Sequence, residues 1–285
     1  MPETNTAAHP PEAGSPDADP FEVVSVGAGL MAGAANVIMQ LGRPGVGYGV
    51  LESKVDSGNL FHHPWKRART TFTYLAVAAL GTDDDKRAFR KAVNRQHAQV
   101  RSGPDSPVEY NAFDPELQLW VAACLFKGYV DGYEALLGGP MPEPLRERLF
   151  EASPRLGTTL QVRAEMWPAT PAEFDDYWKR GLEEVSIDPP VAKLLLAVAD
   201  LEFLPAVLRI PLGPANRWLT TGFLPPVFRE QLGLQWTERD QRRFERVTRG
   251  IGSVVLRMPR AVQQVPYNLF LRDLRRRIRA GKPLV

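Results

Sequence analysis

A histidine on an apolar helix face is the side chain of this sequence with the clearest chemical potential. In the segment AFRKAVNRQHAQVRS, one helix face is formed by residues at intervals of four, four and three: Phe89, Val93, His97 and Val100. A buried imidazole costs free energy unless it is hydrogen-bonded or bound to a metal. Two interpretations of His97 stay open. It is either a core histidine bonded to a carbonyl or a ligand of a buried metal or haem iron.

The preceding helical segment, PWKRARTTFTYLAVAAL, carries a second polar stripe. Positions i, i+3, i+4 and i+7 are occupied by Arg67, Thr70, Thr71 and Tyr74. An arginine and hydroxyls that lead into an apolar half can line a pocket, in which the arginine pairs with a carboxylate such as a haem propionate. The alternative is an amphipathic helix whose polar first turns face solvent.

The other histidines and the cysteine are weaker candidates for a site. His9 lies near the N-terminus, and a metal shared by the neighbours His62 and His63 needs a third ligand that the sequence does not identify. We therefore expect solvated loop residues. Because Cys124 is the single cysteine, a disulfide framework, a thiolate-rich zinc site and a cysteine-ligated iron–sulfur cluster are excluded. Its apolar neighbours, LWVAACLFKG, predict core packing.

A glycine-rich segment partly matches a nucleotide-binding loop. Gly27, Gly29 and Ala32 fit the pattern G-x-G-x-x-A after the apolar run FEVVSV, and Glu52 follows about twenty residues later, where a dinucleotide fold keeps its ribose-binding acid. The chain continues with helical patterns instead of βα units. We therefore favour small residues packed tightly within a helix.

These candidates must be positioned by helices. Start signals precede several apolar segments: Thr82, Asp114, Thr170 and Thr237. Strict alternation of apolar and polar residues is rare, and no hairpin turn is evident. The sequence predicts an all-α fold.

The domain organisation is predicted to be simple. Residues 1–20 are rich in Pro, Ala and Glu without an apolar run, so we expect a disordered tail. Residues 21–285 then form a single-domain helical bundle, with Pro-rich connectors around residues 140–170 and 205–226.

Composition and net charge limit the kinds of partner that the protein can have. The 285 residues are 44% hydrophobic with a net charge of +2, which is typical of a globular protein and argues against a nucleic-acid coat. We see no secretory signal and no uninterrupted membrane span, so we expect a cytoplasmic protein. The C-terminal segment is basic, and its arginines form either a solvated helix face or a peripheral contact with an anionic membrane: Arg272, Arg275, Arg276, Arg277 and Arg279.

Several motifs in combination resemble a known enzyme family. They are NVIMQLGRPGVGYGV, RARTTFTYL, VNRQHAQVRS and YNAFDPELQLWVAACL, followed by LPPVFREQLGLQW and RMPRAVQQVP, and together they extend over roughly residues 22–280. The chain is similar in these motifs to the MpaB / latex-clearing-protein type oxygenases.

The resemblance implies a globin-like helical core that binds haem b and uses dioxygen on a small apolar substrate, isoprenoid or unsaturated-lipid-like, with oxidative cleavage of C=C bonds. It places His97 at the proximal ligand of the iron. Arg67 and Thr71 correspond to the pocket arginine and threonine, and Glu52 lies near a catalytic carboxylate that some members keep at a different spacing. Thr70 stands where rubber-cleaving members have a lysine.

Thr70, Tyr74 and Arg101 are also expected to bind the haem, with Gln40 as a further residue around it. A non-catalytic haem- or lipid-binding protein that associates with membrane surfaces is the alternative function. A nucleotide-dependent oxidoreductase is a third. The substrate and the oligomeric state do not follow from the sequence.

Overall fold

The computed structural model describes residues 18–285, and this part of the chain is helical. Its single β feature is an isolated antiparallel bridge between Arg101 and Asn111. The first half forms α1 (Pro20–Val24), the 3-10 helix η1 (Gly27–Ala32), α2 (Gly33–Leu41), α3 (Pro44–Leu51), η2 (Asp56–Gly58), α4 (Pro64–Leu80), α5 (Asp83–His97) and α6 (Pro115–Leu137). The second half forms α7 (Glu143–Ala152), α8 (Arg155–Thr158), η3 (Ala164–Met166), α9 (Pro171–Glu183), α10 (Pro189–Ala199), α11 (Ala206–Phe223), α12 (Pro226–Gln231), α13 (Glu238–Val255), α14 (Arg260–Gln263) and α15 (Val265–Arg279). The predicted all-α class is confirmed.

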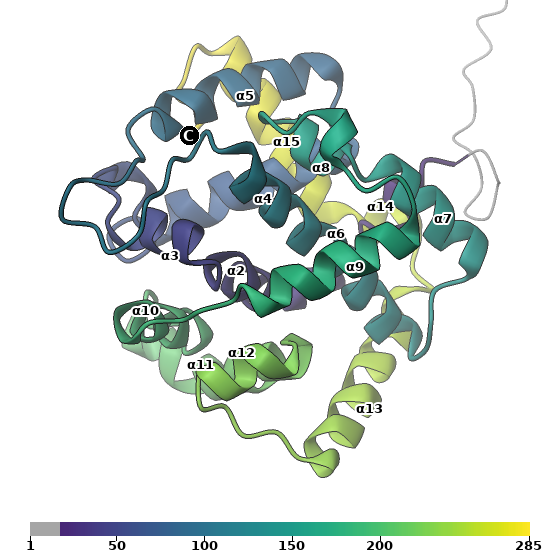
Figure 1. Cartoon of the computed structure of the whole chain (residues 1–285). Helices are drawn as coiled ribbons and strands as arrows, with labels where there is room; N and C mark the ends of the chain where they lie inside the picture. The colour runs from purple at the N-terminus through teal and green to yellow at the C-terminus, as the bar shows by residue number, and fades with distance from the viewer. Residues whose placement is uncertain (1–17) are drawn as a thin grey trace, which may run out of the picture.

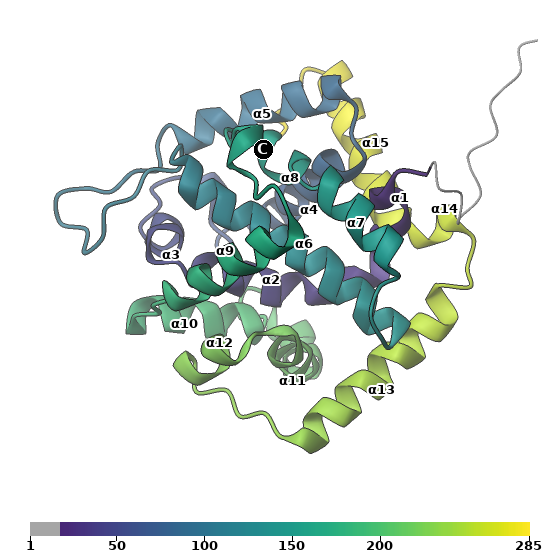
Figure 2. The same cartoon turned by 45° about the vertical axis from the view of Figure 1, so that its right-hand side comes forward.

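Helix α6 is the centre of the arrangement (Figure 1). Helices α2, α8, α13 and η1 pack against it. Helix α15 packs along α4, and these two lie with α5 at one end of the molecule, while α10, α11 and α12 lie at the other. Figure 2 shows α13 leaving this second end and running along the edge of the molecule towards α14. Helix α4, which carries Arg67, Thr70, Thr71 and Tyr74, packs against α15, α5 and α8, and α5, which ends at His97, packs against α4 and α15.

Two apolar clusters meet at α6. One contains Phe89, Phe126 and Phe174. The other contains Trp120 and Cys124 together with side chains of α2, α10 and α12. The fully buried Trp120 indole stacks on that of Trp178 with ring centroids 5.1 Å apart. The predicted core position of Cys124 is confirmed, and burial raises the pKa of its thiol well above the usual value.

The local signals of the sequence act as predicted at several helix ends. Thr82 and Thr237 each form a capping box with the aspartate three residues later, and Asp114 accepts hydrogen bonds from the first turn of α6. Gly138 ends α6 in a left-handed conformation with φ of 73°, which glycine adopts without a steric penalty. Capping therefore fixes where α5, α6 and α13 begin.

The predicted connector at residues 205–226 is wrong, because most of it is the 18-residue helix α11. Pro211 and Pro214 lie inside this helix and cannot donate to the carbonyls of Val207 and Ile210. That half of α11 is exposed, so water can satisfy those carbonyls, while the second half packs against α2, η1 and α13. The packing of the second half of α11 therefore outweighs the destabilising effect of its two prolines. The segment 140–170 is likewise partly helical, since it contains α7, α8 and η3.

The predicted disordered tail lies mostly outside the described residues, and so does His9. Its last residues are ordered, however: Ala18 is buried, and the Asp19 side chain accepts a hydrogen bond from the first turn of α1. No helix within residues 18–285 is long and apolar enough to cross a membrane.

Candidate functional site

His97 is the last residue of α5 and is partly buried. Its Nδ1 atom is buried without a hydrogen-bond partner, and its ring lies edge-on to that of Phe113 with centroids 6.2 Å apart. A buried polar atom without a partner is uncommon in native proteins and calls for a ligand, an ion or a water. The structure therefore does not support the first sequence interpretation, in which the imidazole bonds a protein carbonyl.

The surroundings of His97 favour its neutral form. Burial, and secondly the positive charge of Arg67, lower the pKa of the imidazole from 6.5 to about 4. At neutral pH the ring therefore carries a free lone pair, which is the state that binds metal ions.

Arg67 lies on the second turn of α4 and is itself without a counter-charge. Burial lowers the pKa of its guanidinium, and within the described part of the chain it forms no hydrogen bond or ion pair. Arg67 is only partly buried, so a ligand can reach the guanidinium, and an anion bound there would stabilise its charge. Together with His97 it forms a pair of unsatisfied groups, one a Lewis base and the other a cation.

This pair fits a haem group. A neutral imidazole is a common axial ligand of haem iron, and a planar guanidinium binds carboxylates such as propionates in a bidentate manner. No cluster of three or more His, Cys, Asp or Glu side chains suited to a metal occurs among residues 18–285, so the donor set does not favour a metal ion held by protein ligands alone.

The two neighbouring threonines behave differently. The Thr70 hydroxyl donates to the carbonyl of Lys66, one turn earlier, at 3.0 Å. Thr71 is partly buried, and its hydroxyl has no protein partner among the described residues. Thr71 is therefore the hydroxyl of this stripe that is free to meet a ligand, whereas Thr70 is occupied by its own helix.

Tyr74, which shares a helix face with Arg67, and Arg101 both have partners within the protein. The Tyr74 hydroxyl donates a short hydrogen bond to the carbonyl of Leu156, and burial raises its pKa. It joins α4 to α8. Arg101 is exposed and takes part in the bridge to Asn111. Direct contact of these two residues with a cofactor stays a prediction.

Glu52 follows the last residue of α3 and is held by a tyrosine. The Tyr110 hydroxyl donates to its Oε2 atom at 2.9 Å. Burial, and then the hydrogen bond to Glu52, raise the pKa of Tyr110 to about 12. Tyr48, on α3, donates to Asp188 at 2.8 Å. The Glu52 carboxylate is thus oriented through one oxygen, while Oε1 has no protein partner within the described residues.

A chain of amides that sequence reasoning did not find fixes the end of α5. Gln161 donates to the Asn94 side chain at 2.5 Å, and Gln118 donates to that of Gln161 at 2.7 Å. Asn94 lies one turn before His97, and Gln118 belongs to α6. The chain therefore ties the histidine-bearing turn to the central helix. Its members are far apart in sequence and match no pattern.

His62 and His63 form an exposed cluster with Asp56. Both rings bond to this one carboxylate, at 2.6 and 2.8 Å, and the two hydrogen bonds lower its pKa. The predicted position in a solvated loop is confirmed.

The glycine-rich segment does not form a nucleotide-binding loop. Such a loop follows a β-strand, whereas residues 20–32 form α1 and η1. The prediction that tight packing explains Gly29 and Gly33 is wrong for both, because a Cβ added at either position would meet no neighbouring atom within 4 Å; the close contact is at Gly27, where a Cβ would lie 2.8 Å from Pro266.

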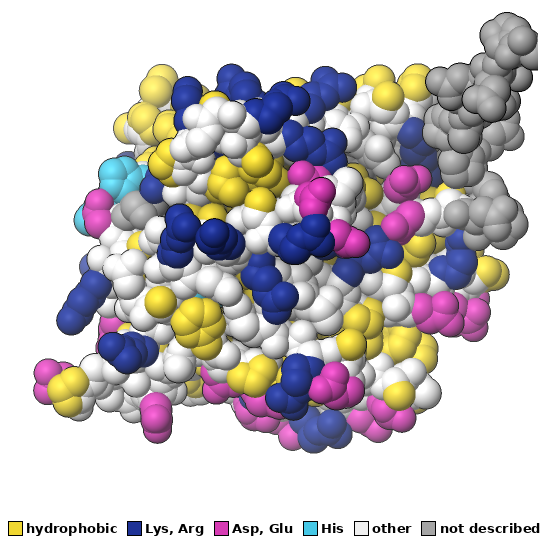
Figure 3. All heavy atoms as spheres, turned by 90° about the horizontal axis from the view of Figure 1, so that it is seen from above, with side chains coloured by type: hydrophobic (Ala, Val, Ile, Leu, Met, Phe, Trp, Pro, Cys, Tyr) yellow, Lys and Arg dark blue, Asp and Glu magenta, His cyan; other side chains and the backbone are white. Residues whose placement is uncertain are grey.

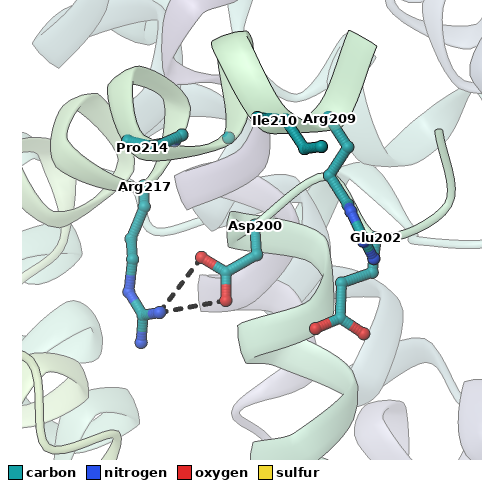
Figure 4. A pocket seen from close by; sticks show the side chains of 7 residues that line it. Asp200, Glu202, Arg209, Ile210, Pro214 and Arg217 are labelled. Atoms are coloured by element: carbon teal, nitrogen blue, oxygen red, sulfur yellow. Dashed lines mark hydrogen bonds and ion pairs between the residues drawn. The ribbon is translucent and has the colours of Figure 1, made fainter. Parts of the chain in front are cut away.

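A shallow hollow of about 390 Å³ lies elsewhere, between α10 and α11 (Figure 4). Arg217 donates twice to Asp200 across it, at 3.0 and 3.1 Å. A second hollow of about 290 Å³ lies along α9. The lining of both is largely charged and contains neither His97 nor Arg67, so these hollows do not suit an apolar substrate.

Comparison with known sequences matches residues 22–253 to the family described as "ER-bound oxygenase mpaB/B'/Rubber oxygenase, catalytic domain". The chain belongs to this family. The matched range begins in α1 and ends in α13, so it contains the helices of His97 and Arg67 and leaves out α14 and α15.

Two mycobacterial proteins are close relatives of this mpaB/rubber-oxygenase family member. They are "Uncharacterized protein Mb2261" of Mycobacterium bovis (strain ATCC BAA-935 / AF2122/97) and "Uncharacterized protein Rv2237" of Mycobacterium tuberculosis (strain ATCC 25618 / H37Rv). Each is 51% identical over 256 residues, which cover 90% of this chain and all of the relative. No solved structure matches the chain, so the globin-like core stays a prediction.

Proposed function

We propose that this protein is a haem b-dependent oxygenase that uses dioxygen on a small apolar substrate, isoprenoid or unsaturated-lipid-like, and cleaves it at a C=C bond. Family membership supports the oxygenase class. The observation that carries the haem assignment is the buried, unpartnered imidazole of His97 beside the unpaired guanidinium of Arg67.

In this proposal His97 holds the iron through its neutral ring. Its lowered pKa keeps protons from competing with the metal at neutral pH. The amide chain from Asn94 to Gln118 holds the last turn of α5 against α6 and so limits movement of the imidazole. Arg67 pairs with a propionate, which stabilises the charge of the guanidinium.

When bound, haem supplies the oxygen chemistry, and the chain supplies access, orientation and polarity. Thr71 presents a hydroxyl that can donate to an oxygen atom of a ligand. Glu52 presents a carboxylate with one free oxygen, which can accept a proton, while Tyr110 keeps its rotamer fixed. Thr70 cannot supply the positive charge of the lysine that rubber-cleaving members have at this position.

The test is retention of haem by the purified protein. After expression with added haem and desalting, we expect a Soret band that His97→Ala abolishes or shifts. Arg67→Gln should retain iron ligation but release haem faster. His63→Ala is the matched control, because this exposed imidazole bonds only to Asp56 and its loss should leave the spectrum unchanged.

Two outcomes contradict the assignment. A wild-type protein without a Soret band excludes haem dependence, and an unchanged band in His97→Ala excludes the proposed ligand. Catalysis is tested with panels of terpenoid and unsaturated lipids under ¹⁸O₂. Label in carbonyl products supports the oxygenase, whereas haem binding without label favours the non-catalytic binding protein.

A further inference from the structure

Helix α13 is fixed to the protein through one narrow face. Phe244, Thr248 and Gly252 are its buried residues. A Cβ at Gly252 would lie 1.8 Å from the carbonyl oxygen of Leu136, so the backbones of α13 and α6 are in direct contact there. This close approach sets the rotation of α13 about its axis, and with it the side chains that face outwards.

The outward side of α13 carries an apolar stripe. Val247, Ile251 and Val254 follow at intervals of four and three, and they are 38%, 36% and 58% exposed. Met258 and Val262, which follow in the chain, are also exposed. Monomeric proteins rarely leave such contiguous apolar surface uncovered without a binding role.

Arginines adjoin this stripe. Arg239, Arg243, Val247 and Ile251 are each four residues apart and therefore form one row along the helix. Arg239 and Arg246 are exposed and form no ion pair with any described residue. Arg243 lies over the Trp218 ring, 5.2 Å from its centroid. The row thus passes from arginines at its start to apolar side chains at its end.

The charge of the whole C-terminal region agrees with this pattern. Residues 238–285 contain 13 Lys and Arg but only four Asp and Glu, a net charge of +9, whereas the complete chain has +2. The preceding residues therefore carry −7. Within this region, residues 246–262, which contain the stripe, have four arginines and no acidic residue, a net charge of +4; residues 263–285 carry the remaining +5, and residues 238–245 are neutral.

We propose that α13 docks peripherally on an anionic lipid surface, with the stripe entering the headgroup region and the arginines pairing with lipid phosphates. A helix with an apolar face and a basic flank lies in the plane of such an interface. A second copy of this chain is disfavoured as the occupant, because two surfaces of the same high positive charge would meet. Nucleic acid offers phosphates but nothing apolar to cover the stripe.

The sequence left the arginines of α15 open between a solvated helix face and a membrane contact, and in the structure most of them are engaged. Arg275 pairs with Asp85, and both Arg276 and Arg277 pair with Asp273. Figure 3 shows the face of the molecule that α5 and α15 form, where acidic side chains lie among the basic ones. Helix α13 is therefore the better candidate, and the proposal does not depend on haem or on oxygenase activity.

The test is co-sedimentation with lipid vesicles. The full chain should bind vesicles of phosphatidylglycerol and phosphatidylcholine in equal parts, and bind pure phosphatidylcholine weakly. High salt, about 0.5 M NaCl, should weaken binding by screening. Val254→Asp should reduce the affinity at least tenfold, on the order expected from a charge placed in the apolar contact.

Val207→Asp is the matched control. Val207 is 78% exposed on α11, so the same charge enters another apolar surface without disturbing a core. Binding equal to that of the wild type supports α13, whereas loss of binding in Val207→Asp, or none in Val254→Asp, overturns the proposal. The proposal is also overturned if the wild type binds duplex DNA but not vesicles. It is overturned as well if light scattering shows a dimer that Val254→Asp converts to a monomer.

Discussion

The contact between α13 and α6 can be tested with a single methyl group. In Gly252→Ala the new Cβ would lie 1.8 Å from the carbonyl oxygen of Leu136 and 2.5 Å from its carbon, which no real contact allows. Neither atom is at the end of a flexible side chain, so one helix must move away from the other. Gly250→Ala is the matched control, because Gly250 lies in the same helix and a Cβ added there would meet no neighbouring atom within 4 Å.

The expected magnitudes follow from two opposing effects. Replacing glycine by alanine within a helix stabilises it by about 1 kcal/mol, and this is the whole effect expected at Gly250. Overpacking costs about 1–3 kcal/mol, and a collision with backbone lies at the upper end of that range. Gly252→Ala should therefore lose about 2 kcal/mol of unfolding free energy. The two variants should differ by about 3 kcal/mol, or roughly 6–12 °C in Tm for a chain of this size.

The assay is urea unfolding followed by circular dichroism, with thermal melts in parallel. Reversibility is checked by refolding, and the slope of the transition should stay unchanged if both variants unfold as the wild type does. A Gly252→Ala protein as stable as the wild type, or as stable as Gly250→Ala, would refute the close approach and with it the rotation of α13 on which its outward stripe depends.

Two further predictions concern buried polar groups. Burial alone would raise the pKa of Asp85, but hydrogen bonds from Arg275 and Thr82 together with the charge of Arg275 outweigh it and lower that pKa. These interactions therefore stabilise the fold above the unfolded-state pKa, and the stabilisation is lost as pH falls through the folded-state pKa. Urea unfolding should show Asp85→Asn less stable than the wild type at pH 7, with the difference shrinking below about pH 4; an equal difference at both pH values contradicts this. Asn36 donates to the Cys124 carbonyl at 2.5 Å and accepts from Gln40, so Asn36→Ala should cost about 1–3 kcal/mol in the same assay, and an unchanged midpoint would show that water replaces it.

Much of the candidate site could be read from spacing. The periodicity of Phe89, Val93 and His97 predicted that the imidazole faces inwards, and the structure confirms its burial. Helix start signals are local, because a cap bonds to a backbone amide two or three residues away. They therefore located the starts of α5, α6, α9 and α13 from the sequence alone.

Other features needed contacts between distant segments. Tyr74 shares a helix face with Arg67, but its hydroxyl is taken by Leu156, 82 residues later. The amides that hold the end of α5 come from three separate helices or loops. Helix α11 forms despite two prolines, because packing of its second half outweighs the local penalty.

The sequence by itself determined the all-α class, the starts of the capped helices and the faces that carry His97 and Arg67, because these depend on residues within a turn or two of each other. The tertiary structure alone decided which polar groups stay without a partner and which surfaces stay uncovered. Whether an imidazole, a hydroxyl or an arginine is satisfied depends on atoms that other parts of the chain bring within hydrogen-bonding distance, and no local pattern contains that information.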